Sequence, residues 1–317
     1  MNEFIPQPDL PALAAAYEQL RKRPPVGTFT PEKLKAIRSM PIPPVQTLRP
    51  IESANVAGPR GPIPVRIIRP QGAVEAVLIS VHAGGWCMGS AAMNDWLNEI
   101  LAQRCGVLSV AIDYRLAPEN PYPAGLDDVM AVAEWLGEVA QAEFGTERLL
   151  VSGSSAGAHL SSQLLLRLRD TRRDLLQRVR AVALSYGCYD ISMTPSVRSA
   201  PEDALFVKLD VHKQLLDFAF PGLDSEARRS PSVSPLFADL KGLPPALFAA
   251  AGIDPMLDDT LFMATRWKAA GNAALLDVWP GCSHLFDTLE PVTGRAYAER
   301  LASWFNAHLA VQDHGQL

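Results

Sequence analysis

Short apolar runs alternate with helical patterns from about residue 64 to the end of the chain. The runs are rich in Val, Ile and Leu, and most are apolar at nearly every position. Such runs are typical of strands that are covered on both faces in a parallel sheet. The alternation predicts an α/β fold with a mostly parallel, doubly wound sheet. The predicted strands span residues 65–69, 76–81, 107–112, 148–151, 181–185, 246–250 and 275–279.

Two regions interrupt this alternation. Residues 1–50 combine two expected helices with a proline-rich link, and residues 188–235 are rich in loops and prolines with one expected helix. Because long insertions in a compact fold are usually lids or binding loops, we expect both to form a helical cap over the carboxyl edge of the sheet. Residues 51–187 and 236–317 then form the core. The alternative is that residues 1–50 and 188–235 only pack at the periphery of this core. Four phenylalanines of the expected cap either line an apolar pocket or simply pack in its interior: Phe4, Phe206, Phe218 and Phe220.

A serine flanked by glycines lies between a predicted strand and a helix, in the pattern G-x-S-x-G. A residue held in a strained turn at this point needs neighbours without side chains, here Gly153 and Gly157, so that strand and helix can approach closely. Such a turn lifts the serine hydroxyl to a helix N-terminus, where developing negative charge is favoured. Ser154 is the rival serine, but only Ser155 has a glycine two residues away on each side. Ser155 is therefore the predicted nucleophile.

The strand predicted at 76–81 runs into a pair of glycines, Gly84 and Gly85. Acyl transfer passes through a tetrahedral oxyanion, which backbone N–H groups stabilise where no side chain blocks their approach. We expect the N–H groups of Gly84, Gly85 and Ala156 to form this oxyanion hole. His82 is expected to hold the loop by hydrogen bonds. An ordinary glycine-rich turn is the simpler alternative.

The turn that carries Ser155 between strand and helix has the form of a nucleophile elbow. In chains with such an elbow, the acid and then the base follow the nucleophile in sequence. Asp254 comes directly after a predicted strand, which places it at the active edge of the sheet, whereas Asp258 and Asp259 begin the next helix. His284 is the histidine after Ser155 that lies on a loop directly following a strand. It would take the proton of Ser155 and return it to the leaving group, while Asp254 would hold the imidazole tautomer.

Composition narrows the possible partners. The net charge of −5 and the pI of about 5.7 give no reason to expect nucleic acid or anionic lipid as a partner. No apolar run approaches the roughly 18 residues of a membrane span, and the first ten residues lack the basic start and apolar stretch of a signal peptide. The four cysteines are scattered, and no ligand set has metal-site spacing. We expect reduced thiols, a cytoplasmic location, no metal and no cofactor.

In this combination and order, the motifs resemble those of the hormone-sensitive-lipase-like esterases of the α/β-hydrolase superfamily. The resemblance implies a capped α/β-hydrolase that cleaves short- to medium-chain acyl esters without a cofactor, often as a homodimer. The residues that carry it are 82–86, 113–119, 123–124, 127–128, 153–157, 254–256 and 283–284.

Three positions depart from the family pattern. Ala83 replaces the first of three family glycines, but the two that align with the oxyanion donors are present. Ser154 stands where the family usually has Asp or Thr, which changes the hydrogen bonding around the elbow. Leu285 stands where the family often has Gly, and we expect it to narrow the acyl or alcohol pocket.

Two other classes of function remain open from the sequence. An amidase, lactonase or carbamate hydrolase would use the same triad and acyl-enzyme route, and the elbow with the following His159 also resembles that of arylformamidases. A non-catalytic ligand receptor is the more distant alternative. Plant gibberellin receptors resemble this family but lack the catalytic histidine, whereas His284 is present in this chain.

Overall fold

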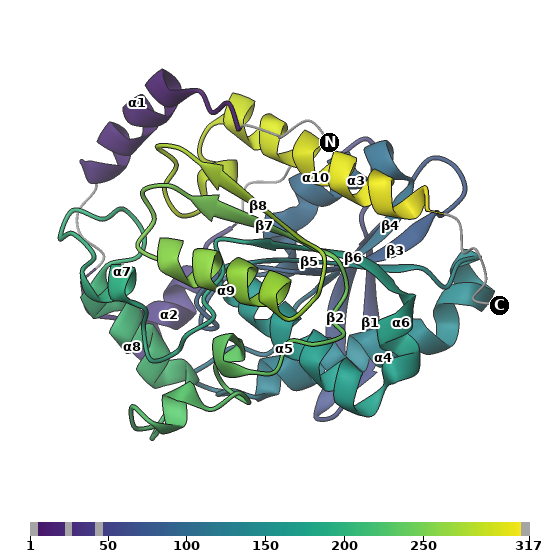
Figure 1. Cartoon of the computed structure of the whole chain (residues 1–317), viewed down its shortest axis with the longest axis horizontal. Coiled ribbons are helices and arrows are strands. Elements are labelled where there is room, and N and C mark those ends of the chain that lie inside the picture. Colours follow the sequence, from purple (N-terminus) through teal and green to yellow (C-terminus); the bar gives the residue numbers. More distant parts are fainter. Residues whose placement is uncertain (1–5, 23–26, 42–46, 312–317) are drawn as a thin grey trace.

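The structure is a computed structural model that describes residues 6–22, 27–41 and 47–311. Its centre is an eight-stranded sheet in the order β1-β2-β4-β3-β5-β6-β7-β8 (Figure 1). Strands β3 to β8 run parallel, whereas β2 is antiparallel to both of its neighbours. The mostly parallel sheet is therefore confirmed. The strands are β1 Glu52–Gly58, β2 Gly61–Ile68, β3 Ala76–Val81, β4 Val107–Ile112, β5 Leu149–Ser154, β6 Val179–Ser185, β7 Ala246–Ala251 and β8 Ala274–Trp279.

The predicted strands lie close to the observed ones, with one strand missed. Strands β3 and β4 have the predicted bounds, and the others differ by one to four residues at an end. Strand β1 was not expected because Val56 is its one buried side chain, so its sequence carries little apolar signal. It forms a hairpin with β2, whose turn is Pro59 and Arg60.

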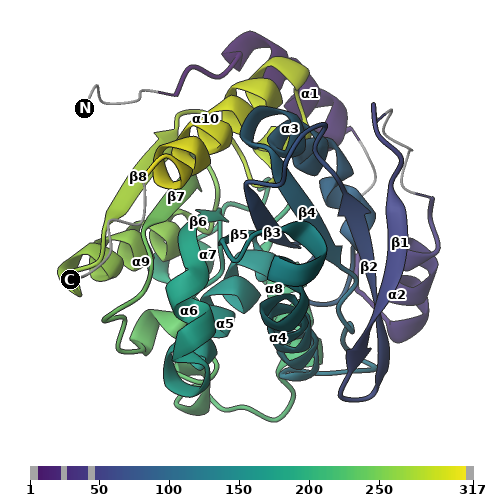
Figure 2. The ribbon, with the colours of Figure 1, turned by 90° about the vertical axis from the view of Figure 1, so that its right-hand side faces the viewer.

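Helices cover both faces of the sheet, as a doubly wound fold requires (Figure 2). Alternate residues of β3 show the two cores: Leu78 packs with one set of helices, and Val77 with the other. The helices of the first core are α1 Leu10–Arg21, α3 Asp95–Cys105 and α10 Pro291–Leu309. Helix α1 falls in the segment 1–50 that was expected in the cap, yet its Leu13 and Tyr17 pack with this core. The helices of the second core are α4 Ala124–Phe144, α5 Ala156–Thr171, α6 Arg173–Arg178 and α9 Leu257–Ala269.

The segments expected to form a cap contribute helices at one end of the sheet. In Figure 1 these helices lie at the left of the sheet. The backbone N–H of Phe29 donates to the Gln214 side chain at 2.7 Å, which joins the N-terminal segment to α8. Phe4 and part of the proline-rich link lie outside the described residues. Besides α1, the helices of the two segments are α2 Pro31–Arg38, α7 Pro195–Arg198 and α8 Leu209–Ala219. In the described residues the 3₁₀ turns are Ala91–Asn94, Ala227–Arg229, Pro235–Phe237 and Phe286–Thr288.

Candidate active site

The tight turn between β5 and α5 holds Ser155 in a strained backbone conformation, with φ at +55°. The Ser155 N–H donates to the carbonyl of Ser185 at 2.9 Å, which fixes the turn against β6. A side chain at Gly153 would meet the carbonyl of Gly157, and one at Gly157 would meet the carbonyl of Val81. The two glycines are therefore required for the close approach of strand and helix, as the motif predicts.

The structure brings Ser155, His284 and Asp254 together in one hydrogen-bonded path. The His284 Nε2 atom lies 2.9 Å from Oγ of Ser155, and its Nδ1 lies 2.6 Å from Oδ2 of Asp254. All three residues are 5% exposed or less. The other carboxylate oxygen of Asp254 accepts the N–H of Met256 at 3.0 Å, which fixes the acid in its loop. With Nδ1–H donating to the carboxylate, Nε2 is free to accept the serine proton.

The loop that carries His284 is held by Tyr17 of α1. The Tyr17 hydroxyl accepts the N–H of Ser283 at 2.9 Å and donates to the carbonyl of Gly281 at 3.2 Å. Tyr186 packs edge-on against the His284 ring, with the ring centroids 4.9 Å apart. The sequence marks Tyr17 only as a position on the apolar face of a helix, so its role in this loop was missed.

The glycines of the oxyanion loop both have positive φ angles, +134° at Gly84 and +57° at Gly85. A side chain at Gly84 would overlap the carbonyl of Met88. In the described part of the chain, no hydrogen bond occupies the N–H groups of Gly84, Gly85 or Ala156. Among the described residues these three N–H groups are therefore unoccupied, and Gly84 and Gly85 line the same pocket as Ser155.

His82 lies directly before this loop and is buried. Its Nδ1 donates to the carbonyl of Ala83 at 2.6 Å, and its ring stacks on Tyr114 with the centroids 4.2 Å apart. The Tyr114 hydroxyl in turn donates to the His82 carbonyl at 3.0 Å. Burial lowers the pKa of His82 to about 4, so the ring is neutral at pH 7. These contacts agree with the expected part of His82 as a support of the loop.

The stretch 113–128 also braces the oxyanion loop. The Arg115 guanidinium binds the buried carboxylate of Asp128 at 2.8–3.0 Å. Arg38 of α2 donates to the carbonyl of Cys87 at 2.8 Å and pairs with Glu119 at 2.8 Å. The Ala117 N–H donates to the carbonyl of Trp86 at 3.0 Å. These residues tie loops together and do not touch Ser155.

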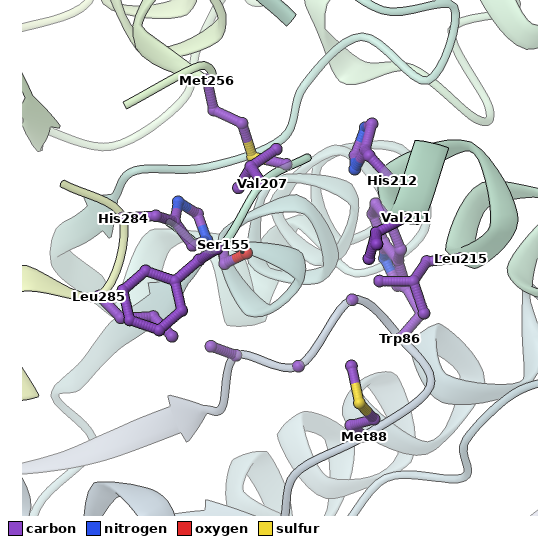
Figure 3. Close-up of a pocket in the computed structure, with 14 residues that line it drawn as sticks. Trp86, Met88, Ser155, Val207, Val211, His212, Leu215, Met256, His284 and Leu285 are labelled. Atoms are coloured by element: carbon purple, nitrogen blue, oxygen red, sulfur yellow. Dashed lines mark hydrogen bonds between the residues drawn. The ribbon is translucent and has the colours of Figure 1, made fainter. Parts of the chain in front are cut away.

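A pocket of about 160 Å³ opens above Ser155 (Figure 3). Phe206 lines this pocket, whereas Phe218 and Phe220 do not; Phe220 packs edge-on against Trp86. Leu285 also lines it, with φ at +61°, a conformation that glycine adopts without strain. Its lining residues are mostly apolar and include Trp86, Met88, Val207, Val211, Leu215 and Met256.

In the described residues, no group of three or more His, Cys, Asp or Glu side chains could hold a metal ion. The four cysteines are buried free thiols. Within the same described ranges, no helix is long and apolar enough to cross a membrane.

Comparison with known proteins places this geometry in a family. The family described as alpha/beta hydrolase fold matches residues 78–288. The chain is 34% identical over 274 residues to carboxylic ester hydrolase LipN of Mycobacterium tuberculosis, covering 82% of this chain and 71% of that protein. Carboxylesterase NlhH of the same species is 34% identical over 250 residues, covering 76% of this chain and 77% of its own.

A solved structure with the same fold is a hyperthermophilic esterase from the archaeon Pyrobaculum calidifontis. It superimposes with a TM-score of 0.78 at 26% identity and covers 96% of this chain and 99% of its own. The chain therefore belongs to the α/β-hydrolase fold family, among its hormone-sensitive-lipase-like esterases.

Proposed function

We propose that the chain is a serine carboxylesterase in which Ser155 is the nucleophile, His284 the general base and Asp254 the acid that orients it. The observation that carries this proposal is the continuous path of hydrogen bonds from Asp254 through His284 to Ser155. As the serine oxygen attacks the ester carbonyl, His284 takes its proton and passes it to the leaving alcohol. Water activated by the same histidine then releases the acid from the acyl-enzyme.

The N–H groups of Gly84, Gly85 and Ala156 stabilise the oxyanion in this proposal, and His82 holds their loop. Its support is that these three N–H groups have no hydrogen-bond partner in the described part of the chain. Removing one donor of this kind reduces the rate by about a hundred- to a thousandfold. The helix N-terminus after Ser155 adds to the same stabilisation.

The pocket supports short- to medium-chain acyl esters as substrates. Its volume of about 160 Å³ is below the roughly 300–1,000 Å³ of pockets for drug-sized ligands. Its mostly apolar lining suits an alkyl chain better than a charged group. The relatives named as carboxylic ester hydrolase and carboxylesterase agree with an ester as the bond that is cleaved.

We also propose the division into a core (51–187 and 236–317) and a cap (1–50 and 188–235). Its support is that five residues of 188–235 line the pocket above Ser155.

We also propose that the protein is a homodimer with a cytoplasmic location. The exposed edge of β8 supports the dimer, and the four free thiols support a reducing compartment. Light scattering coupled to size-exclusion chromatography tests the dimer.

Kinetics on a series of p-nitrophenyl esters tests the function. We expect the highest kcat/KM between acetate and octanoate, and a loss of roughly 10⁴-fold or more in Ser155→Ala. Ser154→Ala is the matched control, because it removes the neighbouring hydroxyl and leaves the path to His284. Undiminished activity in Ser155→Ala would contradict the proposal.

A matched ester and amide distinguish an esterase from an amidase with the same triad. We expect p-nitrophenyl butyrate to be hydrolysed much faster than the p-nitroanilide of butyric acid. A higher kcat/KM for the anilide would favour the amidase.

A further inference from the structure

His212 of α8 lies in the wall of the pocket and has no part in the proposed catalytic path. Its side chain is almost fully buried, with 4% of the residue exposed. Its Nε2 atom has no hydrogen-bond partner among the described residues. Figure 3 shows the ring projecting from α8 across the pocket from His284, with its nitrogens on the side that faces Val207.

A buried nitrogen without a partner is unfavourable in an apolar wall, and such atoms are rare in folded proteins. The neighbours of His212 in this wall are Val207, Val211 and Leu215, none of which has a polar side-chain atom. Among the residues that line the pocket, the other side chains with a polar atom already have a partner. Ser155 and His284 bind each other, and the indole N–H of Trp86 donates to His159. His212 is therefore the polar side chain of the pocket that is left to meet a substrate.

The ring is uncharged at neutral pH. Burial, with the nearby His284 and Arg228, lowers the pKa of His212 to about 4. A neutral imidazole carries one N–H donor and one acceptor, and which nitrogen has the hydrogen depends on the tautomer. A hydroxyl group is both donor and acceptor, so it can bind either tautomer of this ring. A charged group of a substrate would find no side chain of opposite charge among the residues that line the pocket.

We propose that His212 is a specificity-determining residue that binds a hydroxyl group of the substrate, so that the enzyme prefers esters hydroxylated near the scissile bond. This inference rests on the proposed esterase function. The small pocket keeps any substrate close to the ring, since its volume is about 160 Å³. Binding of the hydroxyl group satisfies a nitrogen that a plain alkyl ester leaves unpaired.

Two pairs of esters test the proposal, one for each side of the scissile bond. For the acyl side the pair is p-nitrophenyl butyrate and p-nitrophenyl 3-hydroxybutyrate. For the alcohol side it is ethyl butyrate and 2-hydroxyethyl butyrate. The measured quantity is the ratio of kcat/KM for the hydroxylated ester to that for the plain ester, in the wild type and in variants whose folding is checked by Tm.

In His212→Leu we expect this ratio to fall about five- to tenfold in one of the two pairs, the usual effect of one lost neutral hydrogen bond. His212→Gln, which keeps a donor and an acceptor, should restore most of the ratio. His308→Leu is the matched control on α10 and should keep the wild-type ratio.

Equal ratios in the wild type and in His212→Leu for both pairs would overturn the inference. A ratio that falls in His212→Leu and equally in His212→Gln would also overturn it, because shape and not hydrogen bonding would then set the preference. If the wild type hydrolyses neither plain ester, the proposed esterase function itself fails, which is a different result.

Discussion

The indole N–H of Trp86 donates to Nδ1 of His159 at 3.1 Å and ties the oxyanion loop to the first turns of α5. Because an indole nitrogen can only donate, Nδ1 must accept, and the ring hydrogen is on Nε2. Nε2–H then donates to the carbonyl of Val233 at 2.7 Å. One buried ring thus joins the residue after Gly85, the helix of the nucleophile and the segment 188–235.

His159→Leu should reduce both stability and turnover. It leaves the N–H of Trp86 and the carbonyl of Val233 buried without a partner, at about 1–3 kcal/mol each. We expect the free energy of unfolding to fall by about 2–6 kcal/mol. We also expect kcat to fall about tenfold, because Trp86 borders the oxyanion donors. Urea denaturation and steady-state kinetics measure the two effects. His159→Gln should recover part of each; wild-type kcat in folded His159→Leu would contradict the account.

Mild acid should destabilise the fold through the same histidine. Burial lowers the pKa of His159 to about 4 from the ordinary 6.5, so between these values the unfolded chain binds a proton that the folded chain does not. The free energy of unfolding should therefore fall as the pH drops from 6.5 to 4, by about 1.4 kcal/mol per pH unit for each such histidine. His82 and His212 act in the same direction.

Denaturation curves at pH 7, 6 and 5 measure this dependence. His159→Gln removes one titrating ring, so its free energy of unfolding should fall with pH less steeply than that of the wild type, by about 1.4 kcal/mol per unit. Identical slopes for the two proteins would show that His159 is not the group responsible.

Tyr17→Phe should slow catalysis, although Tyr17 does not line the substrate pocket. The change removes both hydrogen bonds to the loop of His284 and leaves the N–H of Ser283 buried and unpaired. A less well-placed base should lower kcat about tenfold and change KM little, because binding of the substrate is not altered. Kinetics with p-nitrophenyl butyrate measures the two constants separately. A change confined to KM would mean that Tyr17 acts on the pocket and not on the base.

Leu285→Gly should widen the range of esters. Leu285 lines the pocket in a left-handed conformation, so glycine removes both the side chain and the strain. We expect the ratio of kcat/KM for octanoate over acetate esters to rise about tenfold. Leu285→Ala is the matched control, since it opens similar space but keeps the strained backbone, and it should be the less stable of the two. An unchanged chain-length profile in both variants would exclude Leu285 as a limit on size.

Local patterns in the sequence predict the sheet and the family well. Strands β3 and β4 are apolar at nearly every position, so the sequence marks their bounds, whereas the edge strand β1 buries only Val56 and was missed. The family and the α/β-hydrolase fold are confirmed by the relatives and solved structures. The catalytic roles of Ser155, His284 and Asp254 stay predictions, although the structure brings the three together.

Contacts between distant segments could not be predicted. Tyr17 reaches Ser283, which is 266 residues away, and the sequence gives only the apolar face of its helix. Asp259 lies in the first turn of α9, as expected, but it is also buried and accepts the N–H groups of Tyr189 and Asp190 at 2.7 and 2.9 Å. In the sequence, His212 looks like any polar residue of an amphipathic helix, and only the fold places it in an apolar wall. Each of these depends on packing, which no local pattern encodes.

Labelling with a fluorophosphonate, followed by mass spectrometry of the peptides, tests whether Ser155 is the nucleophile. We expect one adduct per chain, on Ser155. Ser154→Ala should still form it, Ser155→Ala should not, and His284→Ala should form it much more slowly. An adduct on another residue would contradict this role of Ser155. So would a Ser155→Ala variant that is still fully labelled and still hydrolyses esters.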